Sequence, residues 1–114
     1  MSNQNKLWFE IPSYVFVVLA RRGMEKISLD QCFLSGCDNS NKELLEPIRK
    51  EEYKEKNHHI KLIHMKCHKC KRKFQLKIDT IKYLVEQKEK DSISVGLVYA
   101  LDENGKNLGH IGYF

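Results

Sequence analysis

Four cysteines, arranged in two close pairs, are the residues of this sequence whose type and spacing could do chemistry. Four residues separate Cys32 from Cys37, and two residues separate Cys67 from Cys70. A structural zinc ion takes four soft ligands at the corners of a tetrahedron, and two ligands close in sequence readily supply two corners. The sequence therefore predicts a Zn²⁺ site, with a segment of 29 residues between the two pairs, made by Cys32, Cys37, Cys67 and Cys70.

Other interpretations of the cysteines stay open. His64 or His68 could replace Cys32 or Cys37 as a ligand. Cys32 could also pack as a small apolar side chain in a protein without metal. Redox chemistry is disfavoured, because the first cysteine of a reactive CxxC pair begins a helix, whereas the residues after Cys70 alternate as a strand does.

The positive charge of the chain is concentrated around the second cysteine pair. The net charge is +5, yet residues 57–78 contain no Asp or Glu, and the rest of the chain has 13 bases against 15 acids. A clustered positive field attracts phosphates. We therefore expect Phe74 or Tyr83 to stack on bases, and seven basic side chains to contact a nucleic acid: Lys61, Lys66, Lys69, Lys71, Arg72, Lys73 and Lys77. The alternative is a solvated lysine face that serves solubility alone.

No catalytic motif accompanies these residues. The sequence lacks GxSxG, P-loop and GxGxxG patterns. Its glutamates cluster in residues 43–55, but at spacings that make ion pairs on a solvated helix, such as Glu46–Lys50. The order of cysteine pair, histidines and cysteine pair resembles the HNH nucleases. That match fails, because only seven residues separate His59 from Cys67 and Asn57 replaces the usual acid. We therefore expect no enzyme activity.

Periodicity and capping signals indicate a small α+β fold. Alternating apolar residues on both sides of the CxxC predict a knuckle hairpin over 60–78. The pair Asn104–Gly105 predicts a type I′ turn that closes a second hairpin over 93–113. Two or three helices are expected from candidates at 12–23, where valines also favour a strand, and at 29–35, 42–56 and 79–90. The second candidate begins with a capping box, Ser28 and Gln31.

Two resemblances follow from these patterns. Residues 61–78, with strand, CHKC, strand and the aromatic Phe74, resemble the second half of a zinc ribbon. That resemblance implies a nucleic-acid-binding, transcription-associated or protein-interaction module. The element order of the N-terminal half resembles a winged helix, in which Gly36 is the turn glycine, a recognition helix starts near Asn41 and the basic hairpin is the wing.

The length of 114 residues suits a single domain, 1–114. No apolar run approaches the roughly 20 residues that span a bilayer, and the polar N-terminus is unlike a signal peptide. We expect a cytoplasmic protein with no membrane contact and with reduced cysteines. An exposed edge of the C-terminal hairpin would invite pairing with a second copy.

The leading hypothesis is a non-enzymatic, zinc-binding accessory or regulatory protein that binds DNA or RNA through the basic knuckle hairpin. The alternative is a protein–protein interaction module of phage or mobile-element type, which inhibits a host or defence machine through contact with an acidic protein surface. Composition does not separate the two hypotheses, since both a phosphate backbone and an acidic protein attract the same lysines.

Overall fold

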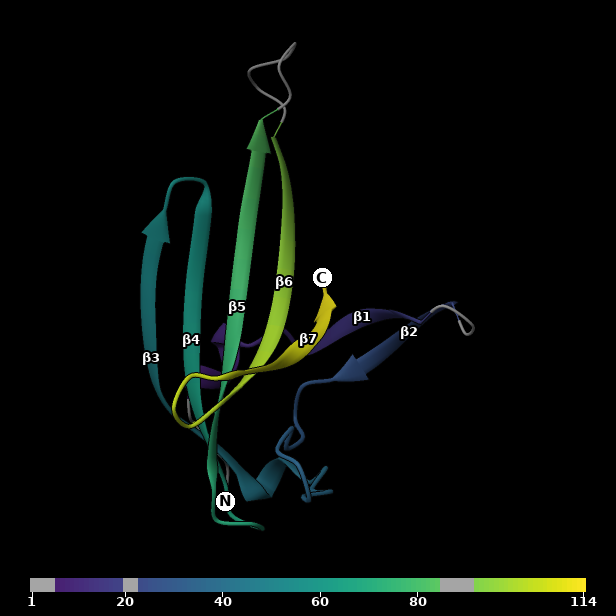
Figure 1. The fold of residues 1–114 in the computed structure, drawn as a ribbon, viewed down its shortest axis with the longest axis vertical. Coiled ribbons are helices and arrows are strands. Elements are labelled where there is room, and N and C mark those ends of the chain that lie inside the picture. Colours follow the sequence, from purple (N-terminus) through teal and green to yellow (C-terminus); the bar gives the residue numbers. More distant parts are fainter. Residues whose placement is uncertain (1–5, 20–22, 85–91) are drawn as a thin grey trace.

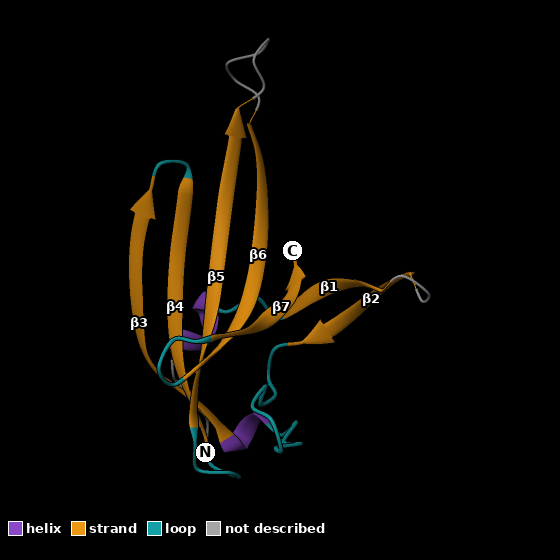
Figure 2. Ribbon diagram, viewed as in Figure 1, coloured by secondary structure: helices purple, strands orange, loops and turns teal. Residues whose placement is uncertain are grey.

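The chain folds into one antiparallel sheet of seven strands, seen in a computed structural model that describes residues 6–19, 23–84 and 92–114 (Figure 2). The strands are β1 (Tyr14–Leu19), β2 (Gly23–Ser28), β3 (Leu45–Glu55), β4 (His58–Cys67), β5 (Lys73–Leu84), β6 (Ser92–Asp102) and β7 (Asn107–Tyr113). Within these ranges, helical structure is limited to two short 3₁₀ helices, η1 (Lys6–Glu10) and η2 (Lys42–Leu44). The prediction of an α+β fold with two or three helices is therefore wrong.

The strand order in the sheet is β2-β1-β7-β6-β5-β4-β3. Strands β3 to β7 form a meander, and the β1–β2 hairpin projects sideways from it (Figure 1). The two parts join at β1 and β7, where Phe16 lies opposite Tyr113. Gly112 permits this approach, because a Cβ atom at that position would lie 2.6 Å from the carbonyl oxygen of Phe16.

Both hairpins that the sequence predicts are present in the sheet. Strands β4 and β5 pair from His58↔Ile81 to Lys66↔Lys73, and strands β6 and β7 pair at the C-terminal end. The second turn is not of type I′, since Gly105 has a φ of 90° but Asn104 is not among the residues with positive φ. The carboxylate of Asp102 instead accepts hydrogen bonds from the backbone N–H groups of Asn104 and Lys106, at 2.9 and 2.8 Å.

None of the predicted helices is present in the described residues, where strands replace three of them and a loop replaces the one predicted over 29–35. The valine-rich stretch at 14–19 is β1, as its β propensity favours. Ser28 and Gln31 form no capping box, because the Gln31 amide donates to the Ser28 carbonyl oxygen at 2.9 Å and the chain enters a loop. Residues 42–44 are η2 and 45–55 are β3, which rules out a recognition helix and the winged-helix resemblance. Residues 79–84 continue β5, and the remainder of that predicted helix lies outside the described residues.

The hydrophobic core lies on one face of the sheet. Alternate residues of β4 and β5 point into it, and the loop after β2 and the chain near η1 cover it. The ring of Phe74 is fully buried there, with its centroid 6.1 Å from that of Phe33 in an edge-to-face contact. Phe74 therefore cannot stack on a base, and the side chain of Tyr83 lies outside the described residues. The core residues include Leu29, Leu34, Ile63, Met65, Leu76 and Ile78.

The edges of the sheet are formed by β2 and β3. Strand β7 lies inside it, yet its register with β1 consists of the one pair Phe16↔Tyr113. The pairing of two copies along the C-terminal hairpin stays a prediction. In the part of the chain that the structure describes, no helix has the length and apolar character to cross a membrane.

Candidate metal centre

The four cysteine sulfurs form one cluster at the end of β4 where Cys67 lies. Their Sγ atoms all lie within 4.8 Å of one another and form no disulfide. The distance is 3.7 Å between Cys37 and Cys67 and 4.0 Å between Cys32 and Cys70. A tetrahedron of thiolates at about 2.3 Å from a central ion has edges of about 3.8 Å. The four residues that the sequence singled out therefore lie together and could hold a metal ion.

The second cysteine pair is positioned by a tight turn at the end of β4. The backbone N–H of Cys67 donates to the Arg72 carbonyl at 2.9 Å, and the N–H of Lys71 donates back to the Cys67 carbonyl at 2.7 Å. Lys71 adopts a φ of 61°, a left-handed conformation that few residues with a side chain adopt. This turn brings the Cys70 sulfur to the same side as that of Cys67.

The first pair lies in the loop between β2 and η2, where the sequence predicted a helix. Gly36 has a φ of 84°, which a glycine adopts without strain, and the N–H of Cys37 donates to the Leu34 carbonyl at 3.2 Å. The N–H of Cys32 donates to the Asn39 carbonyl at 2.9 Å. These bonds fold the loop back, so that both sulfurs face the CxxC turn.

Asn39 is a functional candidate that sequence reasoning missed. Its side-chain oxygen accepts from the backbone N–H of Asn41 at 2.9 Å, which fixes the amide orientation. The side-chain nitrogen then donates to the Cys67 sulfur at 3.5 Å, and the residue is only 3% exposed. Such contacts orient the ligands of a metal and stabilise their charge. An asparagine two positions after a cysteine gives no distinctive signal in a single sequence.

The surroundings of the four thiols differ, and so do the directions in which their pKa values shift. Burial raises the pKa of Cys32. Burial would also raise the pKa of Cys70, but hydrogen bonds from the backbone and the guanidinium of Arg72 outweigh it and lower that pKa to about 6. The same guanidinium donates to the Ser35 carbonyl at 2.8 Å. Arg72 thus ties the two cysteine loops together and stabilises a thiolate at one corner of the cluster.

No histidine of the described residues belongs to this cysteine cluster. The Nε2 atom of His64 lies 2.6 Å from the Glu51 carboxylate, and that of His68 lies 2.9 Å from Glu46. Four cysteines fill a tetrahedral coordination sphere and leave no position for a substrate. A metal here would act as a structural link between the loop that precedes β3 and the end of β4.

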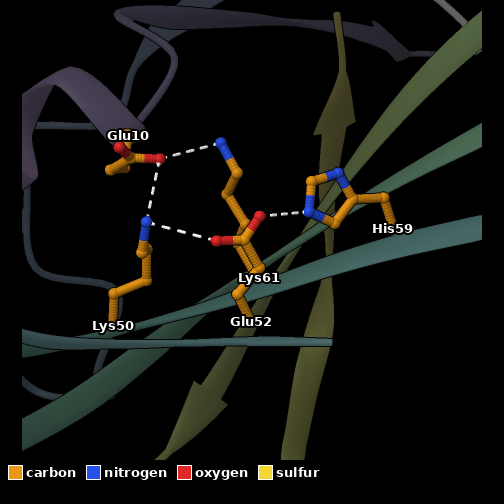
Figure 3. A network of polar contacts seen from close by, with 5 residues as sticks. All are labelled: Glu10, Lys50, Glu52, His59 and Lys61. Atoms are coloured by element: carbon orange, nitrogen blue, oxygen red, sulfur yellow. Dashed lines mark hydrogen bonds and ion pairs between the residues drawn. The ribbon is translucent and has the colours of Figure 1, made fainter. Parts of the chain in front are cut away.

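The structure does not bring the seven predicted basic residues onto one surface. Lys61 lies on the core side of the sheet, in a network with Glu10 and Lys50 that also contains Glu52 and His59 (Figure 3). Lys69 pairs with Asp38 at 2.6 Å, and Arg72 makes the contacts described above. Of the seven, four have no ion-pair partner among the described residues: Lys66, Lys71, Lys73 and Lys77.

Comparisons of this chain with models of protein families, with curated proteins and with solved structures found no match.

Proposed function

We propose that this chain is a non-enzymatic protein in which a structural zinc ion links the two cysteine pairs. It binds the phosphate backbone of a nucleic acid through lysines next to the metal centre. Zinc is supported by the donor set, since four thiolates in a tetrahedron suit Zn²⁺ or iron, and Zn²⁺ brings no redox chemistry. The zinc ion would hold the CxxC turn rigid at the end of the strands that carry the lysines.

The observation that carries the proposal is a pair of lysines directly opposite each other. Lys66 on β4 and Lys73 on β5 are register partners, so their side chains lie side by side on the face of the sheet away from the core. Like charges at such positions are destabilising. A phosphate group between the two ammonium groups would remove this repulsion.

Two further lysines extend this surface. Lys77 lies on the same face of β5 as Lys73, and its Nζ is 5.6 Å from the centroid of the Tyr99 ring. The Tyr99 ring also contacts that of His110, with the centroids 5.1 Å apart. Lys71 is exposed in the CxxC turn. Lysines beside aromatic rings on an open sheet face are a combination that single-stranded nucleic acids bind.

The test is the salt dependence of binding to labelled single-stranded DNA, single-stranded RNA and duplex DNA, measured by fluorescence anisotropy. The double variant Lys66→Gln/Lys73→Gln should bind more weakly, with a slope of log affinity against log salt shallower by about 1.4 to 1.8, because each phosphate contact contributes about 0.7 to 0.9. The control Lys26→Gln changes an exposed lysine on β2 and should keep the parent slope.

An affinity that does not change with salt, or equal slopes for the double variant and the parent, would refute the proposal. A pull-down with and without nuclease separates it from the alternative. A partner that stays bound after nuclease treatment and is lost in the double variant would identify these lysines as the contact to an acidic protein surface instead.

A further inference from the structure

A second positively charged feature lies at the other end of β4. An open pocket of about 670 Å³ adjoins the β3–β4 turn, lined by Lys54, Lys56, Asn57, His58, His59, Thr80 and Lys82. No Asp or Glu is among these lining residues. Strand β4 runs from His58 at the pocket to Cys67 at the metal centre, a separation of about 30 Å at 3.3 Å per residue (Figure 1). The pocket is therefore separate from the cysteine cluster.

The sheet register assembles the pocket. Lys54 on β3 lies opposite His59 on β4, which lies opposite Thr80 on β5, so the three side chains form a row on one face. Lys82, two residues beyond Thr80 on β5, extends the same face. The pocket thus collects side chains from three neighbouring strands.

The turn is fixed to β5 by a reciprocal pair of hydrogen bonds. The backbone N–H of Lys82 donates to the Asn57 carbonyl, and the Asn57 side chain donates to the Lys82 carbonyl, each at 3.0 Å. Lys56 has a φ of 52°, a conformation more usual for glycine. These contacts hold the bases of the pocket close together, although their charges repel one another.

Two carboxylates near the pocket, those of Asp79 and Glu52, are already engaged. Asp79, only 7% exposed, lies 3.0 Å from Nδ1 of His58. Glu52 contacts His59 and also pairs with Lys50 at 3.2 Å, inside the network of Figure 3. The exposed Glu55 lies beside the turn and makes no ion pair among the described residues. The lysines of the pocket, Lys54, Lys56 and Lys82, also have no ion-pair partner there.

We propose that this pocket binds the di- or triphosphate group of a small phosphorylated ligand. Three ammonium groups supply charge-assisted hydrogen bonds to phosphate oxygens, while the Thr80 hydroxyl and the Asn57 amide are neutral donors. The volume lies within the range of sites for small ligands. The lining has no aliphatic residue and no Phe, Tyr or Trp, and its two imidazole rings, His58 and His59, already contact Asp79 and Glu52. The three lysines therefore favour phosphates as the group that the pocket recognises. Free polyphosphate and a nucleoside triphosphate share this group.

The test is isothermal titration calorimetry of the full chain with tripolyphosphate, ATP and adenosine. Tripolyphosphate and ATP should bind and adenosine should not. The variant Lys54→Gln/Lys82→Gln should lose affinity for both phosphates by about tenfold or more, as expected for the loss of charged hydrogen bonds. The matched control Lys26→Gln/Lys106→Gln removes the same charge at two exposed lysines that belong neither to this pocket nor to the proposed nucleic-acid surface, and it should bind tripolyphosphate as the parent does.

Four outcomes would overturn the inference: no heat from tripolyphosphate at about 1 mM, binding of ATP without tripolyphosphate, an unchanged affinity in the pocket variant, or equal weakening in both double variants. If the pocket variant melts at a lower temperature, the single change Lys56→Gln in the exposed turn repeats the test. The proposed nucleic-acid surface is tested separately, because none of its lysines, Lys66, Lys71, Lys73 and Lys77, lines this pocket.

Discussion

Replacement of Asn39 by aspartate reverses one contact of the metal centre and leaves the others in place. The carboxylate of Asn39→Asp keeps an oxygen that accepts from the N–H of Asn41, at the position where the amide oxygen does so at 2.9 Å. The other oxygen replaces the nitrogen that donates to the Cys67 sulfur at 3.5 Å. A donor to a thiolate thereby becomes a negative charge facing it, in a buried position.

The magnitude follows from the two terms that change. The lost hydrogen bond to a charged group contributes about 1.5 to 3 kcal/mol. The repulsion between two unit charges at this distance has an upper limit on the order of 5 kcal/mol at a dielectric constant near 20, and a bound metal reduces it. Changes to residues that hydrogen-bond metal ligands cost about 10- to 100-fold in affinity. We expect the upper end of that range, about 100-fold.

Competition with a chromophoric chelator measures the affinity for Zn²⁺ directly. The control Asn41→Asp introduces the same charge two residues away, at an exposed residue whose side-chain oxygen accepts from the N–H of Glu43 and still can as a carboxylate. Its affinity for Zn²⁺ should stay within about threefold of the parent's, a small change compared with the loss expected for Asn39→Asp, because among the described residues Asn41 makes no contact with a cysteine sulfur. Equal affinities of Asn39→Asp and Asn41→Asp would refute the role assigned to Asn39.

Three further changes test other parts of the structure. In metal-free protein, Cys70 should be the first cysteine alkylated at pH 7, and its alkylation rate should be half-maximal near its pKa of about 6. The variant Arg72→Gln should shift that midpoint to higher pH. Mass spectrometry of the peptides measures the rate at each cysteine, and equal rates at all four thiols would contradict the assignment. Phe74→Ala should cost about 3 to 5 kcal/mol in urea unfolding because the ring is fully buried, whereas Phe9→Ala, at an 88% exposed ring, should cost under about 0.5 kcal/mol. Lys71→Val should destabilise the holo protein by about 1 to 3 kcal/mol more than Lys71→Gly, because valine does not accept a positive φ; equal melting temperatures would show that the turn is not strained.

The cysteine cluster could be predicted from the sequence because a tetrahedral metal site needs four ligand side chains, and these come in closely spaced pairs. Two cysteines at the spacing of Cys67 and Cys70, between alternating strands, indicate a turn that presents two sulfurs. The position of Asn39, and the ion pairs that remove Lys61 and Lys69 from the basic surface, depend on contacts between distant segments. A single sequence carries no signal for such contacts.

The helices were predicted wrongly for a physical reason that β3 illustrates. This edge strand is exposed on both faces from Ile48 onward, so it lacks the alternation of a half-buried strand. Its charges fall at spacings that also suit a helix, as Glu46 and Lys50 do. Pairing with β4 along its length decides the outcome. Asp79, the first residue of the helix predicted over 79–90, is instead buried in β5 beside His58.

Metal content tests the central claim most directly. Native mass spectrometry of protein purified without added zinc, before and after a chelator, should show one zinc ion per chain, and its removal should lower the melting temperature. Cys70→Ser should lose the ion under the same conditions, because four sulfurs within 4.8 Å form the site. A folded chain without metal, which takes up none when Zn²⁺ is added, would contradict the account.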